Sequence, residues 1–274
     1  MSTEHLILCG GIQSPTRQRA PSSAERLELK SAERHGTKCS GNVNLKISDI
    51  RKSALSGLPA IASDLIEVAA YVYAADQATT RGGTHSFEYG EKWRRHFRFE
   101  IPVRRPAIWN SSEVKESLTS TLTFLSDDVY EFDFFEYENP RRIQSHFEFS
   151  LQTPNVQEVD EVVLFSGGLD SLCGAVDEIL LQKRRVALVS HTPAGQLEHR
   201  QQELVTALRS EIRDPLLQPL HVQAEVNKDQ DLNRGFTQRS RSFLYASMAA
   251  VIARIFKLDR IRFYENGVVS LNLP

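Results

Sequence analysis

The segment 162–171, with the sequence VVLFSGGLDS, constrains the fold of this 274-residue chain more than any other stretch. Four consecutive apolar residues at 162–165 are typical of a strand covered on both faces, as in a parallel sheet. Gly167 and Gly168 allow positive φ and let the backbone approach a ligand where a Cβ would collide. From Ser171 onward, apolar residues recur at helical spacing, namely Leu172, Ala175, Val176, Ile179 and Leu180. The segment therefore predicts a buried strand, a glycine turn and an amphipathic helix.

The predicted turn gathers groups that bind anions. The free N–H groups and the positive end of the helix dipole point at it, and Ser166 and Ser171 add hydroxyls. No Gly-Lys-Ser/Thr follows and Gly-x-Gly-x-x-Gly is absent, which excludes a Walker A loop and leaves a dinucleotide fingerprint unsupported. A plain strand–turn–helix corner stays open as the alternative, because glycine pairs are common in turns. We favour a phosphate site at 166–171.

The motif Ser-Gly-Gly-x-Asp-Ser at 166–171 resembles the PP-loop of the N-type ATP pyrophosphatases. The resemblance implies that this loop binds the pyrophosphate end of ATP and that the enzyme transfers AMP to a substrate oxygen. It also implies an α/β fold of the adenine nucleotide alpha hydrolase-like (PP-loop) type, a parallel sheet with helices on both faces.

The overall composition is that of ordinary globular material, with 41% hydrophobic and 25% charged residues. A net charge of −2 and a pI near 6.5 provide no basic footprint, so we do not expect a nucleic-acid partner. No apolar run reaches the length of a membrane span and no signal-peptide pattern begins the chain, so no membrane association is expected. The cysteines (Cys9, Cys39 and Cys173) form no Cys-x-x-Cys pair. They fit a reduced cytoplasm and supply no zinc site, so we expect a cytoplasmic protein.

Residues 1–155 are predicted to form an α+β accessory domain, in which the polar segment 12–41 is a loop or a mobile insertion. A helix capped by Ser63 or Asp64 is expected to run through Ala75, and another to follow Ser112. Strands are expected at 6–9, 44–50, 97–103 and 129–137, with 143–151 pairing with the last of them.

Residues 156–274 follow a strand–helix rhythm and are predicted to form the PP-loop domain. Strands are expected at 161–165, 185–190, 217–223 and 260–264, and helices at about 171–183, 197–212 and 241–257. Such alternation predicts a parallel sheet, whose ligands bind at the carboxyl ends of its strands.

Two further groups of polar residues follow predicted strands. Ser190 and His191 lie where an adenine or ribose would be if the first loop holds phosphates, although a plain polar loop is an equally open interpretation. Arg239 and Arg241 precede a helix, where the dipole disfavours cations, which indicates that they bind an arriving phosphate or carboxylate. A plain surface charge stays an equally open interpretation. The pair His199 and Glu203 is interpreted as a solvated helix face, because two residues do not make a metal site.

Together, four segments resemble the cyano-deazaguanine synthase branch of PP-loop enzymes; they are 166–171, Gly195-Gln196, Arg239-Ser240-x-x-Phe243-Leu244 and Glu265-Asn266-Gly267. Those enzymes make the nitrile precursor of queuosine from a carboxylated deazaguanine, ATP and ammonia. The resemblance covers about 158–274. The residues before 155 resemble an extra domain in relatives associated with bacterial antiphage defence islands.

The chain departs from the synthases in three ways. Arg239-Ser240 replaces their Arg-Asn, and their cysteine cluster, a structural zinc site, has no counterpart here. The sequence stops at Pro274, just past the fourth predicted strand. We therefore expect a fragment, or a shortened member that lacks part of the substrate pocket.

The resemblance implies ATP and Mg²⁺ as ligands and a deazaguanine-type carboxylate as substrate. Asp170 would orient the loop or hold Mg²⁺, Ser171 would donate to the pyrophosphate, and Arg239 would steady the α-phosphate or the substrate carboxylate. These residues would form the catalytic set. The implied ATP contacts are Leu164, Phe165, Ser166, Gly167, Gly168, Leu169, Asp170, Ser171, Ser190 and His191.

The implied reaction forms an acyl-adenylate, from which an amine or ammonia displaces AMP. Two alternatives stay open: conjugation of a deazaguanine to a protein partner, and a non-catalytic ATP-binding scaffold subunit of a defence complex. Thiolation is disfavoured, because Cys173 is interpreted as a small buried hydrophobe rather than a sulfur carrier.

Overall fold

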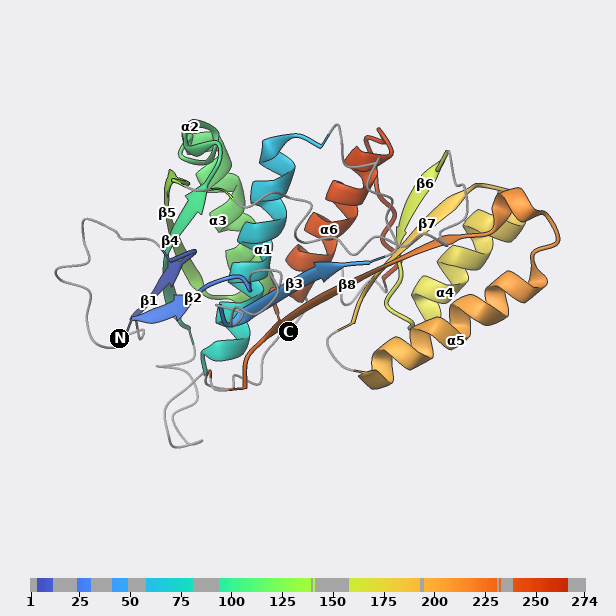
Figure 1. The fold of residues 1–274 in the computed structure, drawn as a ribbon, viewed down its shortest axis with the longest axis horizontal. Coiled ribbons are helices and arrows are strands. Elements are labelled where there is room, and N and C mark those ends of the chain that lie inside the picture. Colours follow the sequence, from blue (N-terminus) through green and yellow to red (C-terminus); the bar gives the residue numbers. More distant parts are fainter. Residues whose placement is uncertain are drawn as a thin grey trace, which may run out of the picture. The chain divides into compact units, whose positions relative to one another are not determined.

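The fold is described from a computed structural model (Figure 1). The described residues are 4–11, 24–30, 41–48, 58–80, 94–138, 140, 158–192, 195–230, 232 and 239–265. The predicted domain boundary at 155/156 and the predicted pairing of 143–151 lie outside these residues, as does most of the polar segment 12–41.

Internal contacts group the chain into two compact units. Unit 1 consists of 1–44, 67–142 and 227–244, and unit 2 of 45–66, 143–226 and 245–274. Each unit is built around parallel strands.

Unit 1 contains a four-stranded sheet in the order β2-β1-β4-β5. Its strands are β1 (Glu4–Cys9), β2 (Glu25–Leu27), β4 (His96–Val103) and β5 (Val129–Glu136). All three pairings are parallel, so the predicted α+β class of this part of the chain is wrong, and it is α/β. β1, β4 and β5 lie close to the predicted strands. The expectation that 12–41 is a loop throughout is wrong, because β2 lies within it and buries Leu27. Their alternating apolar pattern locates them but does not determine their direction, which depends on the helical crossovers.

The helices of this part of the chain are α1 (Ala60–Ala78), α2 (Pro106–Trp109) and α3 (Ser112–Ser126). The predicted cap of α1 at Ser63 or Asp64 is wrong, because both residues are buried inside the helix. The Pro59 carbonyl instead accepts a hydrogen bond from Ala62 N–H (2.9 Å) and starts the first turn.

The β4–β5 pair forms the aromatic core of unit 1. Phe97 lies opposite Tyr130 and Phe99 opposite Phe132, and the Phe99 and Phe132 rings stack with centroids 5.2 Å apart. These side chains are buried, whereas polar residues between them face outward, as the period-two pattern of each strand requires.

A buried ion cluster joins the amino ends of these two strands to α1. The Arg95 guanidinium donates to Asp76 (Nη2–Oδ1 2.6 Å) and to Asp128 (Nη2–Oδ2 2.7 Å), and Nη1 donates to the Thr79 carbonyl (2.7 Å). All three charged side chains are at most 2% exposed. Asp76 also accepts from the N–H and hydroxyl of Ser240, just before α6. These carboxylates raise the pKa of Arg95 against the opposing effect of burial, which is the largest single influence on it.

The second sheet has the strand order β3-β8-β7-β6. Its strands are β3 (Val43–Ile47), β6 (Glu161–Leu164), β7 (Val186–His191) and β8 (Leu220–Lys228). The β6–β7 and β7–β8 pairings are parallel, and helices flank the sheet (Figure 1). The α/β class predicted for this part of the chain is confirmed.

The helices that follow these strands are α4 (Leu169–Val176), α5 (Gly195–Glu211) and α6 (Arg241–Ile255). A π-helical turn at Asp177–Leu181 continues α4, and a 3-10 turn at Pro215–Leu217 precedes β8. Side chains from β6, β7, α4 and α5 form the core of unit 2, including Val163, Phe165, Ala175, Leu188 and Val205.

Two predicted strands of unit 2 differ from the structure. The strand predicted at 217–223 begins only at Leu220, because the Asp214 carboxylate accepts from Leu216 N–H (2.9 Å) and caps a 3-10 turn. The strand predicted at 260–264 is reduced to one bridge between Val163 and Arg262.

The segment around that bridge packs closely on α4. A Cβ on Gly174 would lie 2.2 Å from Tyr264 Cδ2, so only glycine fits there. The Tyr264 hydroxyl donates to Glu178 (2.6 Å), and burial together with this bond raises the pKa of Tyr264 to about 12. Glu161, fully buried at the amino end of β6, lies 3.4 Å from Nε of Arg262.

No helix among the described residues is both long and apolar enough to cross a membrane.

We expect Arg95→Met to lower the free energy of unfolding by about 3–5 kcal/mol, because it leaves two buried carboxylates without their cation. Urea denaturation monitored by circular dichroism measures this. The matched control is Arg94→Met, since Arg94 is half exposed and pairs with exposed Asp127; its cost should stay below about 1 kcal/mol. Equal effects of the two substitutions would contradict the assigned role of the cluster.

Candidate functional site

The loop after β6 has the strand–turn–helix form that the sequence predicts. β6 is buried throughout, and Phe165 N–H donates to the Val189 carbonyl of β7 (2.8 Å) before the chain leaves the sheet. Gly167 then adopts a φ of +81°, which L-residues rarely tolerate. Gly168, with a φ of −84°, is the N-cap of α4.

The serine hydroxyls of this loop form a closed chain of hydrogen bonds. Ser171 Oγ donates to the Gly168 carbonyl (3.0 Å), so its only proton is used there. In the contact of Ser166 Oγ with Ser171 Oγ (3.1 Å), Ser166 is therefore the donor. Gly168 N–H in turn donates to Ser166 Oγ (3.2 Å). Both hydroxyls thus face the amino end of α4.

The amino end of α4 presents backbone donors. The first N–H groups of an α-helix have no acceptor within the helix, and no side chain caps this one at Gly168. The positive end of the helix dipole lies at the same place. The arrangement can accept an anion between the loop amides and the hydroxyls.

Buried side chains hold the carbonyls at the carboxyl ends of β6 and β7. Ser190 Oγ donates to the Phe165 carbonyl (2.8 Å), which uses its proton, so His221 Nε2–H donates to Ser190 Oγ (2.9 Å). Burial, and secondarily the charge of Arg209, lowers the pKa of His221 to about 4. Gln201 Nε2 donates to the carbonyls of Ser166 (3.1 Å) and His191 (3.3 Å).

The implied ATP-contact residues divide into two groups by exposure. Leu169 and Asp170 are exposed at the start of α4, and Ser166, Gly168 and the buried Ser171 surround the turn. Gly167 is buried within the turn, and the other implied residues that are fully or almost fully buried are Leu164, Phe165, Ser190 and His191.

The side chains of this buried group are engaged within the core. His191 contacts the Val226 carbonyl through Nε2 (3.1 Å), and its ring meets Tyr245 edge to face. Ser190 supports the end of β6, as described above. Their present contacts are those of strand-end supports.

Arg239 belongs to unit 1, whereas the loop at 166–171 belongs to unit 2. Its side chain is exposed, and the neighbouring Ser240 is anchored by Asp76. The motif at 265–267 is described only at Glu265, and the side chains of Gly195-Gln196 lie outside the description.

Sequence reasoning did not identify Gln201 or His221 as part of this site. Both act on groups that carry no sequence signal: Gln201 binds two backbone carbonyls, and His221 binds a serine. Their polar character at buried positions becomes apparent only when β6, β7 and β8 are placed side by side.

The predictions for the His199–Glu203 pair and for Cys173 have different outcomes. His199 and Glu203 form an exposed pair (3.2 Å), as predicted for a solvated face. Within the described parts of the chain, no three His, Cys, Asp or Glu side chains gather into a metal-binding group. The prediction that Cys173 is buried is wrong, because it lies on the outer face of α4.

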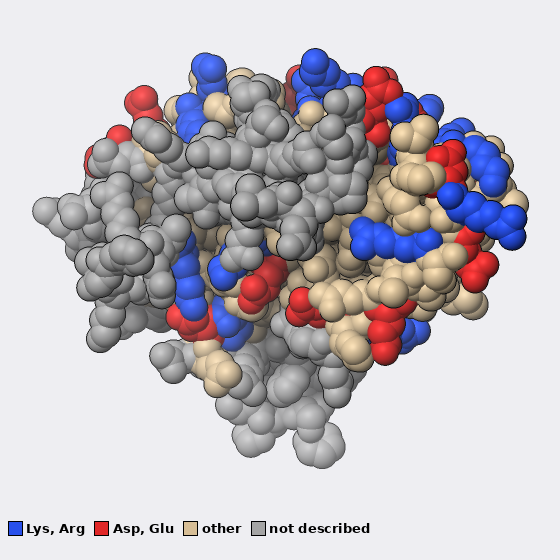
Figure 2. All heavy atoms as spheres, turned by 45° about the vertical axis from the view of Figure 1, so that its right-hand side comes forward, with Lys and Arg blue, Asp and Glu red and all other residues tan. Residues whose placement is uncertain are grey.

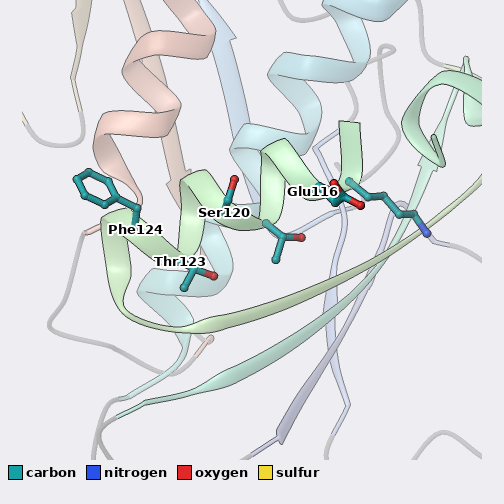
Figure 3. A pocket seen from close by; sticks show the side chains of 6 residues that line it. Glu116, Ser120, Thr123 and Phe124 are labelled. Atoms are coloured by element: carbon teal, nitrogen blue, oxygen red, sulfur yellow. The ribbon is translucent and has the colours of Figure 1, made fainter. Parts of the chain in front are cut away.

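A separate hollow of about 680 Å³ lies along α3 in unit 1 (Figure 3). Its walls are Lys115, Glu116, Thr119, Ser120, Thr123 and Phe124. One exposed helix, α3, supplies all of these described lining residues, so we do not assign the hollow a site. Among the described residues on the face shown in Figure 2, basic and acidic side chains are interspersed.

Comparison of the chain with protein-family models, with curated proteins and with solved structures finds no match. The function is therefore inferred from the geometry of the loop.

Substituting Gly167 should strain the loop. Gly167→Ala places a side chain at φ +81° and its Cβ 3.0 Å from Gln201 Cγ, so we expect a loss of about 1–2 kcal/mol in unfolding free energy. Gly168→Ala is the control, because its φ is ordinary and the reduced entropy of the unfolded chain offsets a tight 3.3 Å contact with Ser166 Oγ. Equal stabilities in thermal denaturation would show that the positive φ is unimportant.

The low pKa of His221 predicts acid sensitivity. Between about pH 6.5 and 4 the unfolded state takes up a proton at this histidine while the folded state does not. The free energy of unfolding therefore decreases as the pH is lowered. The shift corresponds to a loss of about 3 kcal/mol over that interval. His221→Gln should flatten the pH dependence of unfolding over this interval. A wild-type His221 resonance titrating near 6.5 would refute the assignment.

Proposed function

We propose that this chain is an adenylating enzyme of the PP-loop ATP pyrophosphatase type. The observation that carries the proposal is the turn between β6 and α4, where a positive φ at Gly167 places two serine hydroxyls and the helix amides together. This turn lies at the carboxyl end of a parallel strand, where ligands of α/β sheets bind.

The turn suits the pyrophosphate end of ATP. Phosphate oxygens would take hydrogen bonds from the loop amides and from Ser166 and Ser171, whose hydroxyls now bond within the loop and would turn outward. The nucleoside would extend toward the end of β7, the adjacent parallel strand.

Asp170 is exposed in the first turn of α4. A bare carboxylate would repel phosphate, so Asp170 would act as a ligand of Mg²⁺, which prefers carboxylate and phosphate oxygens. The ion would neutralise the charge that develops on the leaving pyrophosphate. A single carboxylate is enough for this role, because Mg²⁺ in such sites keeps several waters.

The proposed substrate is a deazaguanine-type carboxylate, on the basis of the four segments that resemble cyano-deazaguanine synthases. A carboxylate oxygen attacks the α-phosphorus of ATP, the bond to the bridging oxygen breaks, and pyrophosphate leaves with the electron pair. An amine or ammonia then attacks the acyl carbon of the adenylate and AMP departs, carrying the carboxylate oxygen. The protein contributes positioning and charge neutralisation.

Pyrophosphate release from ATP, Mg²⁺, a deazaguanine carboxylate and ammonia tests the proposal. Asp170→Ala should reduce release on the order of 100-fold or more, since charge stabilisation at the reacting phosphates is lost. Its unfolding free energy should change by no more than about 1 kcal/mol, because the side chain is exposed. Asp177→Ala, farther along the same helical segment, is the control and should retain release.

Other outcomes assign the site differently. Release that requires a protein partner would support conjugation of the deazaguanine to that partner. Tight ATP binding without release would support a scaffold subunit of a defence complex. Failure of the wild-type chain to bind ATP or inorganic pyrophosphate would refute the proposal.

A further inference from the structure

Gln201, on α5, contacts the candidate loop at Ser166 and Gly167. It is fully buried, and its Cγ would lie 3.0 Å from a Cβ placed on Gly167. Its Nε2 donates to the carbonyls of Ser166 and His191, which follow or end two adjacent parallel strands. One amide group therefore joins the carboxyl ends of β6 and β7.

The orientation of this amide follows from its partners. Both neighbouring groups are carbonyl oxygens, which only accept, so the NH₂ must face them and the Oε1 must point away. Oε1 is buried and has no hydrogen-bond partner among the residues that the structure describes. Leaving a buried acceptor unsatisfied costs free energy, so both donations have to outweigh that cost.

The contact with Ser166 determines where the next amide points. In a trans peptide the C=O and the following N–H project in opposite directions. No cis peptide occurs among the described residues. Because Gln201 holds the Ser166 carbonyl on the α5 side, Gly167 N–H projects away from α5, to the outer side of the turn.

We propose that Gln201 is a positioning residue of the candidate site: its two hydrogen bonds hold the Ser166–Gly167 peptide so that Gly167 N–H faces the bound pyrophosphate group. This inference rests on the proposed function for its ligand, but the peptide orientation itself does not. Gln201 lies outside the 166–171 motif and would orient its backbone from another helix, α5.

The alternative to positioning is that Gln201 only fills space under the loop. Gln201→Met separates the two, because methionine has nearly the same length and shape but cannot donate. Gln201→Glu adds a pH-dependent test. An ionised glutamate would repel both carbonyls, whereas the protonated acid can donate to one of them, and burial shifts this protonation toward neutral pH.

Isothermal titration with inorganic pyrophosphate and Mg²⁺ measures the effect on binding. We expect Gln201→Met to weaken affinity about tenfold, the loss of roughly one hydrogen bond. Gln201→Glu should bind on the order of 100-fold more weakly than wild type near pH 8, and the ratio to wild type should recover on acidification to about pH 6. Pyrophosphate itself changes protonation between these pH values. Dividing the affinity of the variant by that of wild type at the same pH cancels this effect.

Gln202→Glu is the matched control, because Gln202 is the next residue on the same helix and its exposed side chain donates to Glu198. It should bind pyrophosphate like wild type at both pH values. A pH-independent loss of affinity in Gln201→Glu, or wild-type affinity in Gln201→Met, would overturn the positioning role.

A crystal structure of Gln201→Met without ligand separates this inference from the proposed function. If wild type fails to bind pyrophosphate but the Ser166–Gly167 peptide rotates in the variant, positioning stands and the proposed function fails. If wild type binds and the peptide keeps its orientation in the variant, the positioning role fails and the proposed function stands.

Discussion

The burial of β6 and β7 on both faces is the constraint on which the candidate site depends. A strand enclosed in this way cannot leave its terminal carbonyls to solvent, so buried side chains satisfy them: Ser190 for Phe165, and Gln201 for Ser166 and His191. The backbone at the start of the 166–171 turn is consequently hydrogen-bonded to buried side chains of unit 2. Its shape is preorganised, and a ligand would not have to order a mobile loop.

β4, β5 and β6 begin at paired buried charges, whereas β6 and β7 end at neutral polar groups. At the amino ends, buried charges are paired: Arg95 and Asp128 precede β4 and β5, and Glu161 begins β6 beside Arg262. At the carboxyl ends of β6 and β7 the supporting side chains are neutral, because His221 has a pKa near 4. An anion placed on the turn therefore meets neutral supporting groups there, which favours phosphate binding at a helix amino end.

Much of the architecture could be predicted from periodicity. The apolar run at 162–165, the alternation in β4 and β5 and the helical spacing in α4 all predicted their elements to within a few residues, because burial imposes these periods directly on the sequence. Direction and termination were harder. The alternation in unit 1 predicts an α+β arrangement, but all its strand pairings are parallel, and α1 begins at Ala60 instead of at a side-chain cap.

The sequence by itself determined the strand, the turn and the helix around 166–171, since glycines and serines between a buried strand and an amphipathic helix leave few other local structures. Tertiary structure alone decided how that turn is held. Gln201 lies 35 residues from Ser166 along the chain. Its role depends on backbone carbonyls, which look the same at every residue. Only the parallel pairing of β6 with β7 brings two such carbonyls within reach of one amide.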